Sequence, residues 1–142
     1  MMRRVGRERG SASVELTILI PVLLLFLGAL ALGTRLALAN LAVDSAAAEA
    51  ARSASIARTQ PEAISRAESG ASASLANQDV KCLRQSVRVD TSGFAAPAGT
   101  RATVTADVTC VVNLAGVSIP GVPSSKTITG HASSPLDTYR ER

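Results

Sequence analysis

The longest apolar segment of the chain lies near its amino terminus. No charged residue occurs from Leu16 to Thr34, and apolar character resumes after Arg35 as far as Val43. At about 1.5 Å per residue, the uncharged stretch makes a helix roughly 28 Å long, close to the thickness of the hydrocarbon core of a bilayer. The pattern therefore predicts a membrane-spanning helix.

The helical pattern continues beyond the apolar segment. The sequence NLAVDSAAAEAARSASIAR, residues 40–58, consists mostly of strong helix formers, with alanines at helical spacing. No helix breaker follows in this stretch until Pro61. We expect one helix from about Ser13 to Arg58, roughly 70 Å long, in which Pro21 produces a kink or a local loosening.

Small residues recur every fourth position within this helix, at Ala29, Gly33 and Ala37. Such a strip allows the backbone of another helix to approach closely in a membrane. A lone anchor would need only a leucine-rich surface. The strip therefore favours packing in a helix bundle.

After Thr59 the pattern changes, and shorter elements follow. We predict a second helix over residues 61–77, in which Gly70 is an unfavourable residue, and then strands over 80–90, 101–114 and 126–133. In the middle strand the alternate positions from Ala102 to Val112 form one apolar face, which should pack on a helix. The predicted fold class is α+β: a long amino-terminal transmembrane helix that extends into a small exterior domain, with a second helix and a roughly three-stranded antiparallel sheet.

The distribution of charged residues predicts how the helix is oriented in the membrane. Four arginines, at positions 3, 4, 7 and 9, precede the apolar segment, and basic residues flanking a span stay on the cytoplasmic side. The net charge is +4, and residues 1–10 supply +3 of it. The high isoelectric point therefore comes mainly from the residues that precede the membrane span. It is poor evidence for nucleic-acid binding.

The two cysteines, Cys82 and Cys110, both fall in the predicted exterior part, where disulfides persist. A bond between adjacent strands would close a loop of about 29 residues and stabilise the domain by roughly 3.6 kcal/mol on the chain-entropy model. Two free core thiols are the alternative. A metal site would need both cysteines, His131 and a carboxylate to converge without any short-spaced ligand pair, so we predict no metal.

Catalysis has little support in the sequence. The single histidine, His131, falls on a predicted outer strand, and no phosphate-binding glycine loop or activated-nucleophile motif is present. An enzyme that uses His131 is the weakest of the functional hypotheses. We predict a protein that is not an enzyme and that binds no cofactor.

Glu15 can be interpreted in three ways. It can belong to an ordinary signal peptide cut after Ala37–Ala39, but an apolar run this long exceeds the usual 7 to 15 or so residues. It can cap a plain signal anchor, but a capping box needs Ser or Thr three residues earlier, where Ala12 stands. The third interpretation is a short basic leader, a small residue at a cut, and a glutamate at the fifth position of the product.

This third pattern resembles the class III signal of type IV pilins and pseudopilins, which a prepilin peptidase cuts on the cytoplasmic side. The resemblance implies cleavage between Gly10 and Ser11, so that Glu15 becomes the fifth residue of the mature chain. In a filament, its carboxylate can neutralise the new α-amino group of a neighbouring subunit, which gives a buried charge a partner.

Within this class, GSASVELTILIPVLLL, the AAAEAARSAS helix and the closing SSPLDTYRER are similar to the TadE family of the tight-adherence (Tad/Flp) pilus system. Major Flp pilins are much shorter and usually have Tyr where this chain has Leu16, so the resemblance is to a minor pseudopilin. It implies a role in initiating or assembling a pilus for adhesion or secretion. It also implies as partners a prepilin peptidase, the major Flp-type pilin, other minor pseudopilins and the inner-membrane platform proteins.

The resulting organisation has four parts. Residues 1–10 form a cleaved basic leader, 11–39 the transmembrane helix, 40–78 the helical extension with the second helix, and 79–142 a small β-rich exterior domain. We expect a single pass through the bacterial cytoplasmic membrane with a cytoplasmic amino terminus, or a place within the pilus. The alternative function is a signal-anchored exterior binding module that never enters a filament.

Overall fold

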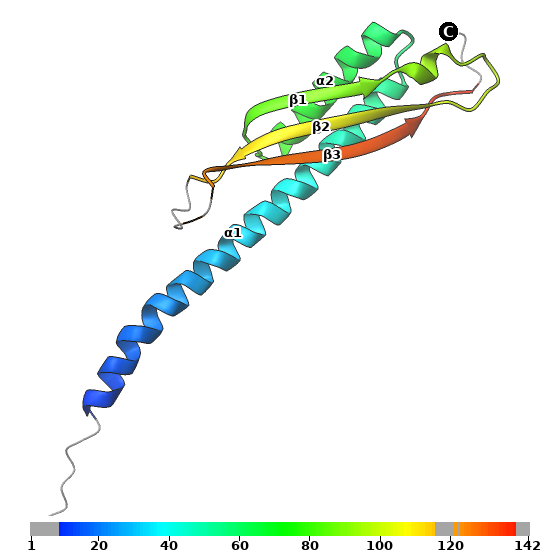
Figure 1. Cartoon of the computed structure of the whole chain (residues 1–142). Helices are drawn as coiled ribbons and strands as arrows, with labels where there is room; N and C mark the ends of the chain where they lie inside the picture. The colour runs from blue at the N-terminus through cyan, green and yellow to red at the C-terminus, as the bar shows by residue number, and fades with distance from the viewer. Residues whose placement is uncertain (1–8, 116–120, 122, 139–142) are drawn as a thin grey trace, which may run out of the picture. The chain divides into compact units, whose positions relative to one another are not determined.

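The computed structural model describes residues 9–115, 121 and 123–138, with the side chains of residues 9–14 left out. In chain order the elements are helix α1 (Arg9–Ser55), helix α2 (Gln60–Asn77), strand β1 (Cys82–Asp90), the 3₁₀ turn η1 (Ser92–Ala95), strand β2 (Thr103–Asn113) and strand β3 (Ser125–Pro135) (Figure 1). These elements confirm the predicted fold class. The chain divides into two units, Met1–Arg35 and Leu36–Arg142.

The first unit contains the apolar part of α1. Pro21 lies inside this helix and does not end it. The large apolar side chains from Leu16 to Leu30 are exposed in the isolated chain. Among the described elements, α1 alone is long and apolar enough to cross a bilayer, and it fits a single-pass membrane anchor.

The second unit is built on an antiparallel sheet of order β1-β2-β3. Burial alternates along the middle strand β2, and its inward residues form the predicted apolar face: Val104, Ala106, Val108, Cys110 and Val112. Helix α2 and the second half of α1 cover that face, and the opposite face of the sheet is open (Figure 1). The alternation seen in the sequence therefore sets which face of the sheet meets the helices.

The helices contribute mainly alanine to this core. The buried alanines are Ala42, Ala46, Ala47, Ala50, Ala51 and Ala54 on α1, and Ala63, Ala67 and Ala71 on α2. Small side chains let the backbones come close, and two glycines mark the closest points. A Cβ atom on Gly130 of β3 would lie 2.6 Å from the carbonyl oxygen of Val43, and one on Gly70 of α2 would lie 2.7 Å from Oγ of Ser53. Gly70, unfavourable for a helix, is thus explained by the contact between α1 and α2.

Helix α2 starts with a cap that the sequence contains as the pattern Thr-x-x-Glu and that our sequence analysis did not identify. The Thr59 hydroxyl accepts a hydrogen bond from the backbone N–H of Glu62 at 3.4 Å. The Glu62 carboxylate accepts from the backbone N–H of Arg58 at 3.0 Å and from the Arg66 side chain at 2.9 Å. Side-chain caps of this kind stabilise the start of a helix because they satisfy backbone N–H groups that have no partner within it.

The cap predicts a pH dependence. The backbone hydrogen bond from Arg58, and then that from the Arg66 side chain, lower the pKa of Glu62 from its ordinary value of 4.5. A lowered pKa contributes stability above the ordinary value and loses it as the pH falls through the folded-state pKa. We expect the stability difference between the wild type and Glu62→Gln to be constant near neutral pH and to shrink below pH 4.5.

Urea unfolding of both proteins across the acid range measures this difference. The pKa of Asp90 is also lowered, by hydrogen bonds from Ser92, but this residue is present in both proteins, so its effect cancels. A difference between the two proteins that stayed constant on acidification would refute the role of the Glu62 charge.

Candidate functional site

The proposed processing site lies at the start of α1. The helix begins at Arg9, so the peptide bond between Gly10 and Ser11 falls in its first turn. The first turn of a helix has few intrahelical N–H bonds to lose and frays readily. A peptidase could therefore open this bond without unfolding the rest of α1.

Glu15 follows this bond by one helical turn, and its side chain is exposed. Within the described part of the chain, no basic group lies within ion-pair distance of its carboxylate. The next charged residue along α1 is Arg35, which at about 1.5 Å per residue lies roughly 30 Å further along the helix. A carboxylate beside hydrocarbon is costly without a partner, so Glu15 needs either the membrane interface or a group on another chain.

The small-residue strip is also open. Ala29, Gly33 and Ala37 are all exposed, and a Cβ atom added to Gly33 would meet nothing within 4 Å. The described chain supplies no helix that fills this strip. The packing of a helix from another chain against this strip stays a prediction.

The predicted disulfide is present. Cys82 at the start of β1 is bonded to Cys110 of β2, with 5.4 Å between their Cα atoms. Cys110 is fully buried on the face of the sheet that meets the helices. The bond joins the edge strand β1 to the middle strand, and it rules out the free-thiol and metal alternatives for these two residues.

His131 lies on the edge strand β3, on the open face of the sheet. Its Nδ1 atom is hydrogen-bonded to the carboxylate of Asp107, the residue opposite it on β2, and both side chains are largely exposed. Neither residue contributes to the lining of the groove described next. In the described residues, no three His, Cys, Asp or Glu side chains lie close enough together to hold a metal ion.

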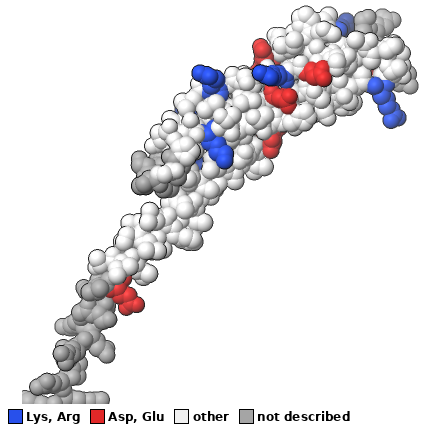
Figure 2. All heavy atoms as spheres, in the orientation of Figure 1, with Lys and Arg blue, Asp and Glu red and all other residues white. Residues whose placement is uncertain are grey.

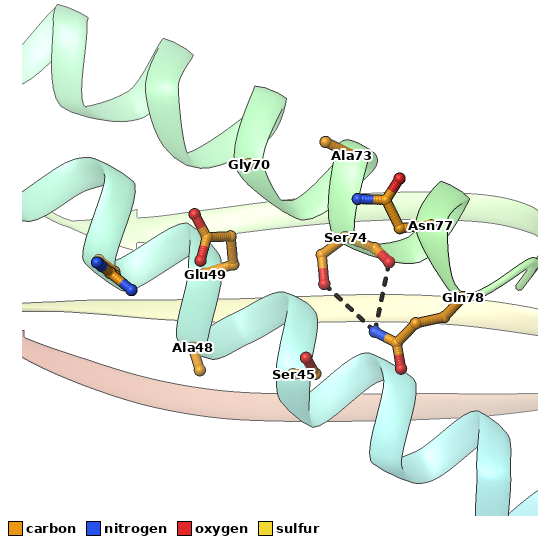
Figure 3. A pocket seen from close by; sticks show the side chains of 9 residues that line it. Ser45, Ala48, Glu49, Gly70, Ala73, Ser74, Asn77 and Gln78 are labelled. Atoms are coloured by element: carbon orange, nitrogen blue, oxygen red, sulfur yellow. Dashed lines mark hydrogen bonds between the residues drawn. The ribbon is translucent and has the colours of Figure 1, made fainter.

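An open groove follows the seam between α1 and α2 (Figure 3), which the sequence analysis did not predict. It is lined by small and polar residues: Ser45, Ala48, Glu49, Arg52, Gly70, Ala73, Ser74, Asn77 and Gln78. Gln78 closes one end by donating from Nε2 to the carbonyl and hydroxyl oxygens of Ser74, at 3.3 and 3.4 Å. Its shallow shape and small side chains reflect the close approach of the two helices.

These features fit a single-pass membrane protein in which one apolar helix leads into a small disulfide-bonded domain. A family model described as TadE-like protein matches residues 10–52, the segment that holds the proposed processing site, Glu15 and the small-residue strip. This segment of the chain is therefore similar to the TadE-like family, in agreement with the resemblance seen in the sequence. No curated protein and no solved structure matches the chain.

Proposed function

We propose that this chain is a minor pseudopilin that a prepilin peptidase processes and that takes part in initiating or assembling a Tad/Flp pilus. The observation that carries the proposal is the family match beginning at Gly10, on the proposed cut, and running through the whole apolar segment. The amino terminus would be cytoplasmic and the second unit exterior, because the arginines precede the span.

Processing would change the charge at the start of the helix. Removal of residues 1–10 takes away four arginines and leaves an α-amino group on Ser11. In a filament, the exposed Glu15 carboxylate of one subunit can pair with this amino group on its neighbour. Pairing offsets the cost of placing both charges in an apolar bundle, and it fixes the axial register of the two helices.

Packing of the same helices would use the open strip. Ala29, Gly33 and Ala37 allow close approach of a second apolar helix, such as that of the major Flp-type pilin or another minor pseudopilin. The platform proteins of the inner membrane are the further partners that this role requires. The proposed role is structural and needs no enzymatic activity of the chain itself.

The test is the substitution Glu15→Ala in cells that produce the pilus. We expect the leader to be removed as in the wild type, while the number of assembled pili falls about tenfold or more, since a register-fixing ion pair is lost. Glu49→Ala is the matched control, because Glu49 is an exposed glutamate on the same helix outside the apolar segment. Pilus counts measured by electron microscopy, with the mass of the mature chain, give both results.

An unchanged pilus count in Glu15→Ala would contradict the assembly role. It would favour the alternative, a signal-anchored exterior binding module that is not incorporated in a filament. The observation behind that alternative is that the family match ends at residue 52, before α2 and the sheet.

A further inference from the structure

Strand β1 leaves one edge of the sheet unpaired. The strand order is β1-β2-β3, so β1 pairs with β2 on one side only. Within the described residues, no backbone hydrogen bond reaches its other side. A free edge nine residues long presents a row of backbone N–H and C=O groups with which an extended segment can pair. This edge is therefore a template for a fourth strand.

A groove lies beside this edge, between β1 and α2. Two hollows form it, with volumes of about 460 and 340 Å³. Ser72 of α2 and Gln85 of β1 line both hollows, and Nε2 of Gln85 donates a hydrogen bond to Oγ of Ser72 at 3.2 Å. Each hollow is many times larger than the roughly 30 Å³ that a water molecule occupies, so it has room for a side chain. We call the two hollows the edge groove.

The edge groove reaches the free edge of β1. Its larger hollow is lined by Glu68 and Ser72 of α2 and by Gln85, Ser86 and Val87 of β1. Ser86 pairs with Thr109, so its side chain belongs to the open face of the sheet, yet this residue lines the hollow on the helix side. The hollow therefore extends to the backbone of β1, beside which an added strand would lie.

A strand added to β1 would place its side chains alternately on the two faces of the sheet. On the helix side, every second side chain would enter the edge groove beside Gln85 and Val87. On the open side, the other side chains would lie beside Arg84, Ser86 and Arg88. The two sides of β1 therefore select for different side chains in the added strand.

Two cations define the chemistry of the open side. Arg84 and Arg88 are exposed, and neither forms an ion pair among the described residues. Asp107 lies opposite Arg88 on β2, but its carboxylate is hydrogen-bonded to His131. Asp90, at the end of β1, accepts a hydrogen bond from the backbone of the following turn. An added strand with Asp or Glu at alternate positions would supply the two arginines with partners.

The positive charge at this edge is local. Figure 2 shows basic and acidic side chains interspersed over the face of the second unit that it displays. Nucleic acid is typically bound by basic side chains clustered over one face. Arg84 and Arg88 are four residues apart on one strand, a distance of about 13 Å, and so match two side chains of a single extended segment.

We infer that the free edge of β1 and the edge groove bind an extended acidic segment of a partner protein, which adds a fourth strand to the sheet. Backbone hydrogen bonds to β1 supply affinity, Arg84 and Arg88 pair with Asp or Glu on the open side, and small apolar side chains fill the edge groove. All of these residues lie in the second unit. The inference therefore goes beyond the proposed function and does not depend on the processing of α1.

The experiment measures the binding of synthetic peptides to the full chain in detergent micelles by fluorescence anisotropy. The probe is a fluorescent peptide of nine residues, as long as β1, in which Val and Glu alternate. One control peptide has Lys in place of Glu, and the other is the Val/Glu peptide with every backbone N–H methylated. We expect the probe to bind about tenfold or more tightly than either control, since one loses the ion pairs and the other the backbone hydrogen bonds.

The charge requirement is tested with two double variants. Arg84→Gln/Arg88→Gln should weaken the binding of the Val/Glu peptide about fivefold or more. Arg52→Gln/Lys126→Gln removes the same charge from exposed positions on other elements and should leave binding unchanged. The comparison of peptides on the wild type needs no substitution, so it stands even if a variant folds poorly.

The groove and the edge are tested separately. Ser72→Phe fills the edge groove and should weaken binding of the Val/Glu peptide severalfold, because its side chains lose their place beside α2. Ser69→Phe, at an exposed position of α2 outside the edge groove, is the matched control and should bind as the wild type. Hydrogen exchange should slow at amides of residues 84–88 when the peptide binds and stay unchanged across β3.

Equal affinity for the Val/Glu and Val/Lys peptides would overturn the inference. So would protection of β3 in place of β1, or full binding in Ser72→Phe. If the free edge of β1 is already protected without peptide, and more so at higher protein concentration, a second copy of the chain occupies it and the inference is wrong.

Discussion

Replacing both cysteines by alanine, in Cys82→Ala/Cys110→Ala, is expected to lower the free energy of unfolding of the exterior domain by about 3–4 kcal/mol. The disulfide closes a loop with a sequence separation of 28 and restricts the unfolded chain accordingly. The rest of the domain has few large side chains to compensate. Its fully buried residues are mostly alanines, and the largest of them are Val43, Val104, Val108 and Cys110.

Urea unfolding of the full chain in detergent, followed by circular dichroism, measures the loss. The matched control is the wild type treated with a reductant, which breaks the crosslink without removing side-chain volume. Both should lose a large fraction of the stability of a small domain, whose total is on the order of 5–15 kcal/mol. A loss below about 1 kcal/mol in both would show that the fold does not depend on this bond.

The second large effect is expected for Gly130→Ala, a loss of about 2–3 kcal/mol. The added Cβ atom would lie 2.6 and 2.8 Å from the carbonyl oxygen and carbon of Val43, and 3.0 Å from Cα of Asp44. These are backbone atoms of α1, so no side-chain rotation relieves the overlap. The sheet would have to move away from the helix, which loosens the packing of the buried alanines around it.

Thr129→Ala, at the neighbouring exposed position of β3, is the matched control and should change stability little. Hydrogen exchange of the β2 and β3 amides locates the effect. Faster exchange across both strands in Gly130→Ala, with Thr129→Ala like the wild type, is the expected pattern. Stability and exchange unchanged by Gly130→Ala would show that α1 and β3 do not approach each other as closely as described.

Much of the fold could be predicted because its patterns are periodic. The apolar run of α1 has the length of a bilayer, and the strict alternation from Ala102 to Val112 fixes the buried face of β2. The disulfide followed from two cysteines on neighbouring strands in an exterior domain. The helix and the buried face of β2 each follow from a single segment, and the disulfide follows from the pairing of the only two cysteines in the sequence.

The remaining features depend on segments far apart in the sequence. Gly70 and Gly130 look like weak points of a helix and a strand, and only the packing against α1 explains them. The cap at Thr59 differs, because its pattern with Glu62 was present in the sequence and was not recognised.

The candidate site also has a part that the sequence predicts and a part that depends on other chains. The sequence pointed to Gly10, Ser11 and Glu15, and the family match covers all three. Their function depends on other chains, namely a peptidase and neighbouring subunits. For that reason these functions are tested by a measurement on the protein isolated from cells.

The most direct test of the central claim is the amino-terminal sequence of the mature protein isolated from cells with a functional pilus system. Cleavage between Gly10 and Ser11 predicts a mature chain that begins Ser-Ala-Ser-Val-Glu and keeps α1. A chain that begins at Met1, or one that begins at Asn40 after removal of the apolar segment, would contradict the proposed pseudopilin.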